Sequence, residues 1–195
     1  MKNILKAAVL MAALALSACV TIPSAPAGAY KVSPAYHVTL GRQWSDLSPI
    51  MYGQPKSVKL LTIDGPALNR LYVTDGLAPG GFIVKPTKKE QPTPTYRAGM
   101  TPNELAEFLV DTVAALDYER TEMSGLRPAK FGDADALRID IKAVTKEGLL
   151  ISGTALVAES GGKLYVILYL APTEHYYGST LSEVEGIMNT AHLGA

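Results

Sequence analysis

The sequence predicts an α+β domain in which a long helix and a C-terminal helix pack on an antiparallel sheet. Three observations indicate this fold class. A capped amphipathic helix begins near residue 101, three β-rich runs joined by short turns follow it, and a second amphipathic helix closes the chain. Strands joined by such short turns pair as antiparallel neighbours, and each helix buries its apolar stripe against a face of the sheet.

The first helix is predicted from its local signals. Thr101 and Glu104 have the spacing of a capping box, and Pro102 takes the first helical position. The residues that then recur at helical spacing are Leu105, Phe108, Leu109, Thr112, Val113 and Leu116. This stripe predicts a helix with one face on the sheet.

Strands are expected on both sides of this helix. Residues 57–63 and 68–74 are β-rich and flank Asp64-Gly65-Pro66-Ala67, which predicts a hairpin. Short strands are also expected at 36–40 and 82–85. After the helix, residues 137–142 alternate apolar and polar, as in a strand with one solvent face, whereas 149–157 and 164–170 are almost continuously apolar and should be covered on both faces.

A last helix is expected to open near Thr180, with Glu183 three residues further on. Its apolar stripe consists of Leu181, Val184, Ile187, Met188 and Ala191. His192 is expected in its final turn, where a cation complements the helix dipole.

The N-terminus has the three parts of an export signal. Lys2 and Lys6 precede an apolar run over residues 7–16, which is shorter than the roughly 20 residues of a bilayer-spanning helix. Leu16-Ser17-Ala18-Cys19 resembles the lipobox of bacterial lipoproteins, in which the chain is cut between Ala18 and Cys19 and the cysteine thiol carries lipid. The alternative is an ordinary secretory signal with a chance cysteine near its end.

We therefore divide the chain into a lipoprotein signal peptide (1–18), a lipidated cysteine with a flexible Pro/Ala/Ser/Gly-rich tether (19–35) and one α+β domain (36–195). Cys19 is the only cysteine, so no disulfide can form within the chain. A diacylglyceryl group with an N-acyl chain such as palmitate attaches stably to a membrane. The expected location is the cell envelope facing the periplasm, and Val20 resembles outer-membrane rather than inner-membrane sorting if the cell is Gram-negative.

The charge balance excludes nucleic acid as an expected partner. Removal of Lys2 and Lys6 with the signal lowers the 18 basic residues to 16, against 18 acidic residues, so the net charge is −2. Nucleic-acid-binding domains instead carry a basic patch.

Three stretches carry a family resemblance: residues 131–139, residues 162–167, and Ala171-Pro172 before the last helix. With the order of elements from Tyr36 onward, they resemble the PsbP-like superfamily, which includes an extrinsic protein of the oxygen-evolving complex, a nuclear Ran-release factor and DcrB-like bacterial lipoproteins. The resemblance implies an α/β/α sandwich, no shared catalytic residues, and binding or assembly roles. The proline-bearing loop 86–99 departs from the pattern.

The tentative ligand or partner surface is Glu174-His175-Tyr176-Tyr177, before the last helix. A carboxylate, an imidazole and two phenols stand in sequence here, but a metal site needs three or four ligands at recognisable spacing, so an ordinary hydrogen-bonded loop is the favoured interpretation. Residues 152–154 lack a nucleophile elbow and Gly76–Gly81 lack dinucleotide-loop spacing. We therefore expect no catalytic residue, no metal and no cofactor.

Two further groups have open interpretations. The cations of the proline-bearing loop are either solvated or touch lipid head groups or an acidic partner: Lys85, Lys88, Lys89 and Arg97. Tyr165 and Tyr169 either pack in the core or line an interface.

The function predicted from these observations is a non-catalytic binding or assembly module on a membrane-anchored lipoprotein, with an envelope protein as its possible partner. The alternative is an envelope hydrolase whose site is assembled from scattered residues such as Asp64, Glu174 and His175.

Overall fold

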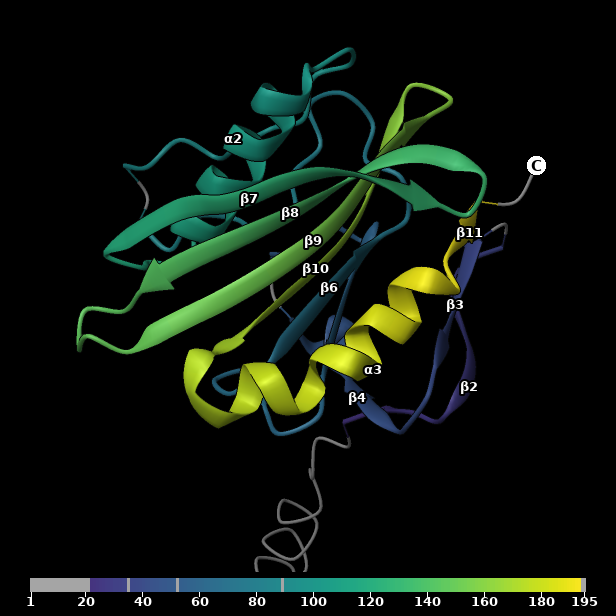
Figure 1. Ribbon diagram of the computed structural model, residues 1–195, viewed down its shortest axis with the longest axis horizontal. Helices are drawn as coiled ribbons and strands as arrows, with labels where there is room; N and C mark the ends of the chain where they lie inside the picture. The colour runs from purple at the N-terminus through teal and green to yellow at the C-terminus, as the bar shows by residue number, and fades with distance from the viewer. Residues whose placement is uncertain (1–21, 35, 52, 89, 194–195) are drawn as a thin grey trace, which may run out of the picture.

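The computed structural model describes residues 22–34, 36–51, 53–88 and 90–193 (Figure 1). The predicted signal peptide, the cleavage site after Ala18 and the lipidation site at Cys19 lie outside the described residues. No helix within the described part is both long and apolar enough to cross a bilayer.

The fold is built around an eight-stranded sheet with the strand order β1-β4-β5-β6-β10-β9-β8-β7. Every neighbouring pair is antiparallel. The strands are β1 (Ser24–Ala25), β4 (Trp44–Asp46), β5 (Val58–Thr62), β6 (Arg70–Thr74), β7 (Arg120–Phe131), β8 (Ala134–Val144), β9 (Leu150–Ser160) and β10 (Lys163–Pro172). The hairpin β5–β6 and the meander β8–β9–β10 confirm the sequence-based prediction.

A smaller sheet and the helices lie on the faces of the large sheet. The small sheet has the order β11-β3-β2, with β2 at Gly28–Ser33, β3 at Tyr36–Leu40 and β11 at His192–Leu193. The helices are α2 (Pro102–Ala114) and α3 (Gly178–Asn189), and two short turns are η1 (Ser48–Ile50) and η2 (Thr173–Tyr177).

Two hydrophobic cores, one on each face of the large sheet, confirm the predicted sandwich. On one face Phe108 and Leu109 of α2 pack with Ile139 of β8. On the other, Val184 and Ile187 of α3 pack with sheet residues and with the small sheet. In Figure 1, α3 crosses in front of the sheet and α2 lies at the top. Burial of these two stripes is the main stabilising term of the fold.

Helix α2 begins as predicted. The Thr101 hydroxyl accepts a hydrogen bond from the Glu104 amide (3.3 Å), and the Glu104 carboxylate accepts one from the Thr101 amide (2.8 Å). Two of the backbone N–H groups at the start of the helix are thereby satisfied.

Helix α3 begins differently from the prediction. It starts at Gly178, and Glu183 does not cap it. The Glu183 carboxylate instead accepts hydrogen bonds from the Gly41 amide (2.8 Å) and from the Trp44 indole (3.4 Å). His192 lies in β11 opposite His37, not in a helical turn. The chain leaves the helix after Asn189 because its last residues pair with β3.

Residues 22–34, predicted as part of a flexible tether, belong to the folded body. Ser24 and Ala25 pair with β4, and β2 pairs with β3. Ala25 and Val32 are 2 % and 5 % exposed because they fill the second core. The prediction was wrong here because the Pro-, Ala- and Gly-rich composition carries no apolar period, and β1 pairs with a strand about 20 residues further along the chain.

Residues 82–85 also differ from expectation, since they form no strand. Ile83 and Val84 are nevertheless buried in the α2-side core. The apolar pattern therefore predicted the burial of these residues correctly, but it predicted a strand where the structure has none.

Strand β7 is the outer edge of the large sheet, and the sequence did not predict it. Its register with β8 shifts between Met123 and Gly125, which is a β-bulge, and Pro128 interrupts the row of backbone donors. Both features are typical of edge strands.

Candidate functional site

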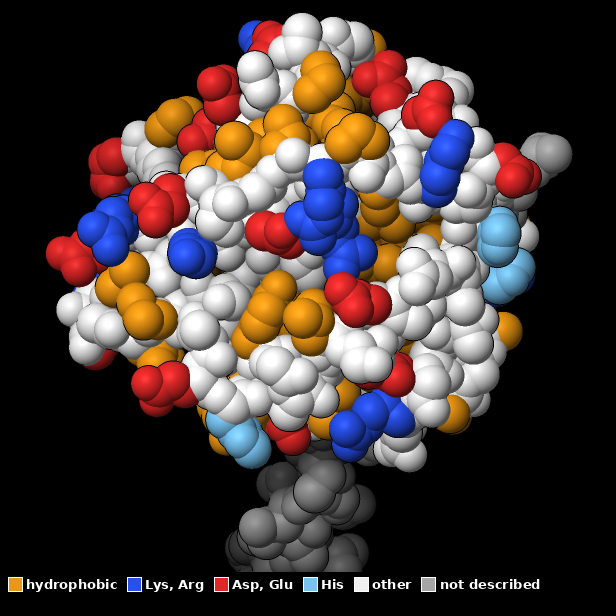
Figure 2. All heavy atoms as spheres, viewed as in Figure 1, with side chains coloured by type: hydrophobic (Ala, Val, Ile, Leu, Met, Phe, Trp, Pro, Cys, Tyr) orange, Lys and Arg blue, Asp and Glu red, His pale blue; other side chains and the backbone are white. Residues whose placement is uncertain are grey.

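The half of the large sheet that α3 leaves uncovered carries a band of polar side chains. We call it the open face: the side chains of β7, β8 and β9 that point to the α3 side. They are Arg120, Glu122, Arg127, Arg138, Asp140, Lys142, Ser152 and Thr154. Figure 2 shows basic and acidic side chains side by side in the middle of this face.

The open face follows from strand periodicity. Arg138, Asp140 and Lys142 alternate along β8 with Ile139 and Ile141, which are 0 % and 2 % exposed on the α2 side. The predicted one-sided strand is thus confirmed, and its polar side is the open face.

The centre of the open face is a hydrogen-bonded cluster, the arginine network: Arg127, Arg138, Asp140, Thr154 and Glu185. Thr154 accepts a hydrogen bond from Arg138 Nε (2.8 Å) and donates one to Asp140 Oδ1 (2.9 Å). Arg127 pairs with the other oxygen of Asp140, and Arg138 also pairs with Glu185 (3.3 Å). Both guanidinium groups are therefore held in place.

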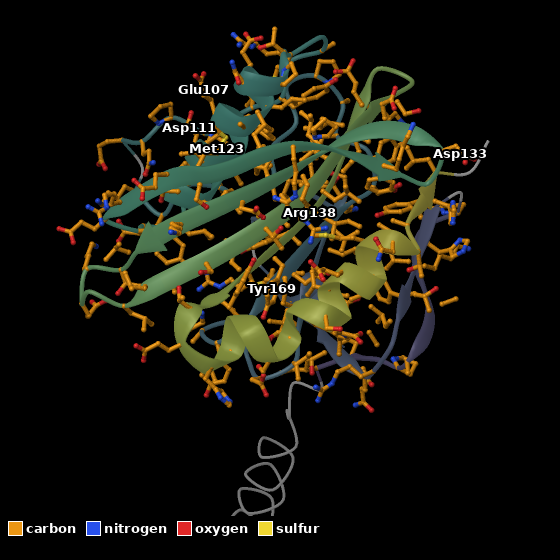
Figure 3. The ribbon with its side chains drawn as sticks, viewed as in Figure 1. Glu107, Asp111, Met123, Asp133, Arg138 and Tyr169 are labelled. Carbon is orange, nitrogen blue, oxygen red and sulfur yellow. The ribbon has the colours of Figure 1, made fainter. Side chains whose placement is uncertain are left out.

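Arg138 is the most enclosed charged member of this network. Only 11 % of its side chain is exposed, against 51 % for Arg127. Burial lowers the pKa of Arg138, and the charge of Glu185 opposes this effect. An arginine stays protonated at physiological pH after such a shift, so a fixed positive charge lies in a partly desolvated position (Figure 3).

A hollow of about 380 Å³ lies beside the network, between β7–β8 and α3. Its walls carry the guanidinium groups of Arg127 and Arg138 and the carboxylate of Glu185, and Leu156 and Met188 add apolar surface. Guanidinium groups bind carboxylates in a bidentate manner. The hollow therefore suits an acidic group on an otherwise apolar segment.

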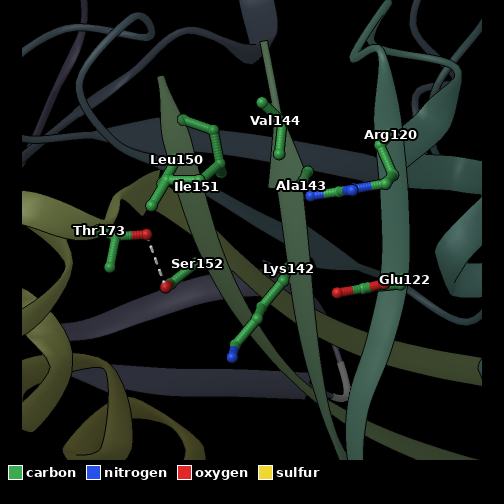
Figure 4. A pocket seen from close by; sticks show the side chains of 9 residues that line it. All are labelled: Arg120, Glu122, Lys142, Ala143, Val144, Leu150, Ile151, Ser152 and Thr173. Carbon is green, nitrogen blue, oxygen red and sulfur yellow. Dashed lines mark hydrogen bonds between the residues drawn. The ribbon is translucent and has the colours of Figure 1, made fainter. Parts of the chain in front are cut away.

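A second, smaller pocket lies at the other end of the open face (Figure 4). It has a volume of about 170 Å³, and Arg120, Glu122 and Lys142 project into it beside two hydroxyls. The Ser152 and Thr173 hydroxyls are 2.9 Å apart and hydrogen-bonded. This volume is below that of typical ligand pockets, so it holds a small group only.

A third hollow, of about 460 Å³, lies between α2 and β7. Glu107 and Asp111 line it beside Met123 (Figure 3), and no basic side chain is among its lining residues. The two carboxylates point outward from an exposed helix face, which is the ordinary state of such a surface.

The structure separates the four residues of the predicted loop surface. Glu174 and His175 are exposed, whereas Tyr176 and Tyr177 are half-buried. The Tyr177 ring stacks on Tyr169 with centroids 5.6 Å apart. Burial and the nearby Asp140 carboxylate raise the pKa of Tyr177. Tyr177 thus borders the open face, and the binding role of the whole loop stays a prediction.

The backbone of this loop is strained at His175. Its φ and ψ angles are 67° and −64°, a γ-turn conformation that non-glycine residues rarely adopt. The imidazole packs edge-on against Tyr176 at 5.0 Å. The turn redirects the chain from β10 into α3.

The structure does not bring the residues of the hydrolase alternative together through hydrogen bonds among the described residues. Asp64 accepts a hydrogen bond from Asn69 (2.7 Å) within the β5–β6 turn, and none of the hydrogen bonds of the described residues links it to Glu174 or His175. The described ranges contain no group of three His, Cys, Asp or Glu side chains placed to hold a metal ion.

The structure also places the loop cations and the tyrosines whose interpretation was open. Lys88 pairs with Asp117 (3.0 Å) and Arg97 with Glu104 (3.2 Å), so these loop cations have partners within the chain. Tyr169 is 0 % exposed and packs in the α3-side core, as the core interpretation predicts.

Two network residues, Arg127 and Glu185, were missed by reasoning from sequence. The alternation of Arg138 and Asp140 was visible, but β7 was not predicted, and the register that brings Arg127 opposite Arg138 follows from that strand. Glu185 reaches the network only because α3 crosses the sheet.

Comparison with known proteins identifies the fold. No model of a protein family matches the sequence, and no curated protein matches it. Among solved structures, the cyanobacterial PsbP (CyanoP) of Synechocystis sp. PCC 6803 aligns with a TM-score of 0.57 and 12 % identity, covering 91 % of this chain and 95 % of that protein. The Ran-binding protein Mog1p of Saccharomyces cerevisiae aligns with a TM-score of 0.51 and 11 % identity, covering 89 % and 96 %. The chain therefore has the PsbP/Mog1-like α+β fold.

Proposed function

We propose that this chain is a membrane-anchored lipoprotein of the cell envelope whose open face binds a protein partner without catalysing a reaction. The arginine network carries the proposal. It holds Arg127 and Arg138 in fixed positions next to a hollow that can accept a carboxylate, and pre-arranged arginines at a partly buried surface are typical of binding hot spots.

The chemistry of the partner follows from the charges. The hollow exposes two guanidinium groups and one carboxylate above Leu156 and Met188, so the partner presents an acidic side chain flanked by apolar ones. The same fold is found in a Ran-binding protein, which supports a binding role for a protein of this shape.

The test compares two arginines on opposite faces. Arg127 pairs with Asp140 on the open face, and Arg97 pairs with Glu104 near the start of α2. The full-length chain carrying Arg127→Glu, the chain carrying Arg97→Glu and the parent chain are captured from detergent-solubilised envelopes, and the bound proteins are compared. We expect Arg127→Glu to lose a protein that the other two retain. Identical bound proteins in all three samples would contradict the proposal.

The anchor has its own test. Cys19→Ser removes the thiol that would carry lipid, so fractionation should find the variant released from membranes with its signal uncut or misprocessed. An intact mass without acyl chains on the native protein would refute the lipoprotein assignment.

A double variant distinguishes the binding proposal from the hydrolase alternative. Glu174→Ala with His175→Ala should leave partner capture unchanged, because both side chains are exposed outside the arginine network. Loss of an envelope hydrolytic activity in this double variant would favour the enzyme.

A further inference from the structure

We infer that the β1 edge of the large sheet lies against the lipid surface, and that the open face is held away from that surface. The inference rests on the proposed lipid at Cys19, and it names the orientation that such an anchor imposes. The lipid bilayer is the partner of the β1 edge.

The first observation is that the chain is fixed to the sheet very early. Ser24 pairs with Ser45 and Ala25 with Trp44. The Pro23 carbonyl accepts a hydrogen bond from the Asp46 amide (2.8 Å). The folded body therefore begins at Pro23, not near residue 36.

The second observation is the length of chain left for reach. Pro23 follows Cys19 by four residues. A chain spans at most about 3.6 Å per residue, so four residues reach no further than about 14 Å in any conformation. Acyl chains place Cys19 at the boundary between headgroups and hydrocarbon, and the headgroup layer itself is roughly 5–8 Å thick. The β1 edge therefore cannot leave the membrane surface.

The third observation is the surface at this edge. Ile22 and Ile50 are 49 % and 41 % exposed, and they are two of the five large hydrophobic side chains that are exposed among the described residues. Ile22 precedes Pro23, and Ile50 ends the short turn η1 that follows β4, the pairing partner of β1. Contact with the lipid interface would remove these side chains from water.

The strand order then sets the height of the open face. β1 is the first strand of the order and β9, β8 and β7 are the last three. Strands lie about 4.8 Å apart, so β9 and β7 stand roughly 24 Å and 34 Å from β1. In Figure 1, β4, the neighbour of β1, lies low in the view and β7 crosses the upper part. The arginine network is thus presented to a partner beside the membrane, not to the bilayer itself.

The experiment uses two exposed serines on the two edge strands, Ser24 in β1 and Ser124 in β7. Because acylation occupies Cys19, a cysteine introduced at either position is the only free thiol. The acylated full-length variants Ser24→Cys and Ser124→Cys are labelled with a fluorophore. They are reconstituted into vesicles of phosphatidylethanolamine and phosphatidylglycerol that contain a headgroup-linked quencher.

We expect quenching at position 24 to be several-fold stronger than at position 124. Insertion of about 20 Gly/Ser residues between Thr21 and Ile22 adds an r.m.s. reach of roughly 25 Å, and it should abolish most of this difference. Equal quenching at the two positions, or quenching that the insertion leaves unchanged, would overturn the inference.

The anchor and the orientation can fail separately. The mass of the purified protein reports acylation of Cys19 independently of quenching. An acylated protein with equal quenching refutes the orientation and keeps the anchor, whereas an unacylated protein refutes both.

Discussion

Arg127 and Arg138 lie directly opposite one another across β7 and β8, on the same side of the sheet. Like charges in this position are unfavourable, and a fold tolerates them only with compensating anions. Asp140 pairs with Arg127, and Glu185 pairs with Arg138. The network is therefore balanced within itself but retains hydrogen-bonding capacity on both guanidinium groups.

This balance predicts that Asp140→Asn destabilises the fold. The change removes a charge that Arg127 contacts and that Thr154 donates to, so we expect the free energy of unfolding to fall by about 1–2 kcal/mol. Urea denaturation measures it. Asp135→Asn is the matched control, because the Asp135 side chain is 97 % exposed, and its surface pair with Lys130 should contribute nothing measurable. Equal effects of the two substitutions would mean that the network does not stabilise the open face.

The capping box of α2 predicts a second change in stability. Thr101→Ala removes the side chain that accepts from the Glu104 amide, and loss of an N-cap costs about 1 kcal/mol. Thermal unfolding followed by circular dichroism should show a lower Tm. Asn103→Ala, at an exposed position in the first turn, serves as the control and should leave Tm nearly unchanged.

The contact of Glu183 with Gly41 and Trp44 predicts a local loosening. Glu183→Ala removes the acceptor for both donors and leaves the indole N–H of a fully buried tryptophan without a partner among the described residues. We expect a loss of about 1–3 kcal/mol in the free energy of unfolding. Trp44 is the only tryptophan, so its emission reports the change directly. Glu183→Gln keeps an acceptor oxygen and should restore most of the stability; failure of this rescue would point to charge, not hydrogen bonding.

The burial of Tyr169 predicts that the stability of the fold decreases at alkaline pH. Burial raises the pKa of Tyr169 from 10.0 to about 12, so the folded protein keeps a proton that the unfolded chain releases. This contribution to stability is complete below pH 10.0 and is lost as the pH rises toward about 12. Tyr169→Phe should be less stable at neutral pH, because it loses the hydrogen bond to the Tyr176 carbonyl (3.1 Å). Its stability should nevertheless fall less steeply than that of the parent between these pH values, and parallel pH curves for the two proteins would contradict the assignment.

Local and short-range signals explain what the sequence predicted of the fold. The capping box and apolar stripe of α2, the β5–β6 hairpin and the β8–β10 meander each depend on residues close in sequence, and each is confirmed. β1 depends on a partner further along the chain, β4, whereas β2 pairs with the adjacent β3 but gave no periodic pattern. β7 escaped prediction because its polar residues, bulge and Pro128 interrupt alternation.

The candidate site was less predictable than the fold. A loop rich in functional groups, Glu174–Tyr177, drew attention, but only Tyr177 among these residues borders the arginine network. Arg127, Arg138 and Glu185 come from three elements, and only the register of β7 on β8 and the crossing of α3 bring them together. The spacing of residues in the sequence does not predict which side chains from separate elements come into contact.

The proline and the bulge in β7 limit the edge-to-edge association of neighbouring copies. An outer strand with an unbroken row of free backbone groups would invite neighbouring copies to pair with it and extend the sheet. Pro128 and the kink after Met123 break up the row of groups that such growth requires. Neighbouring copies of the chain can therefore lie close together without joining edge to edge into fibrils.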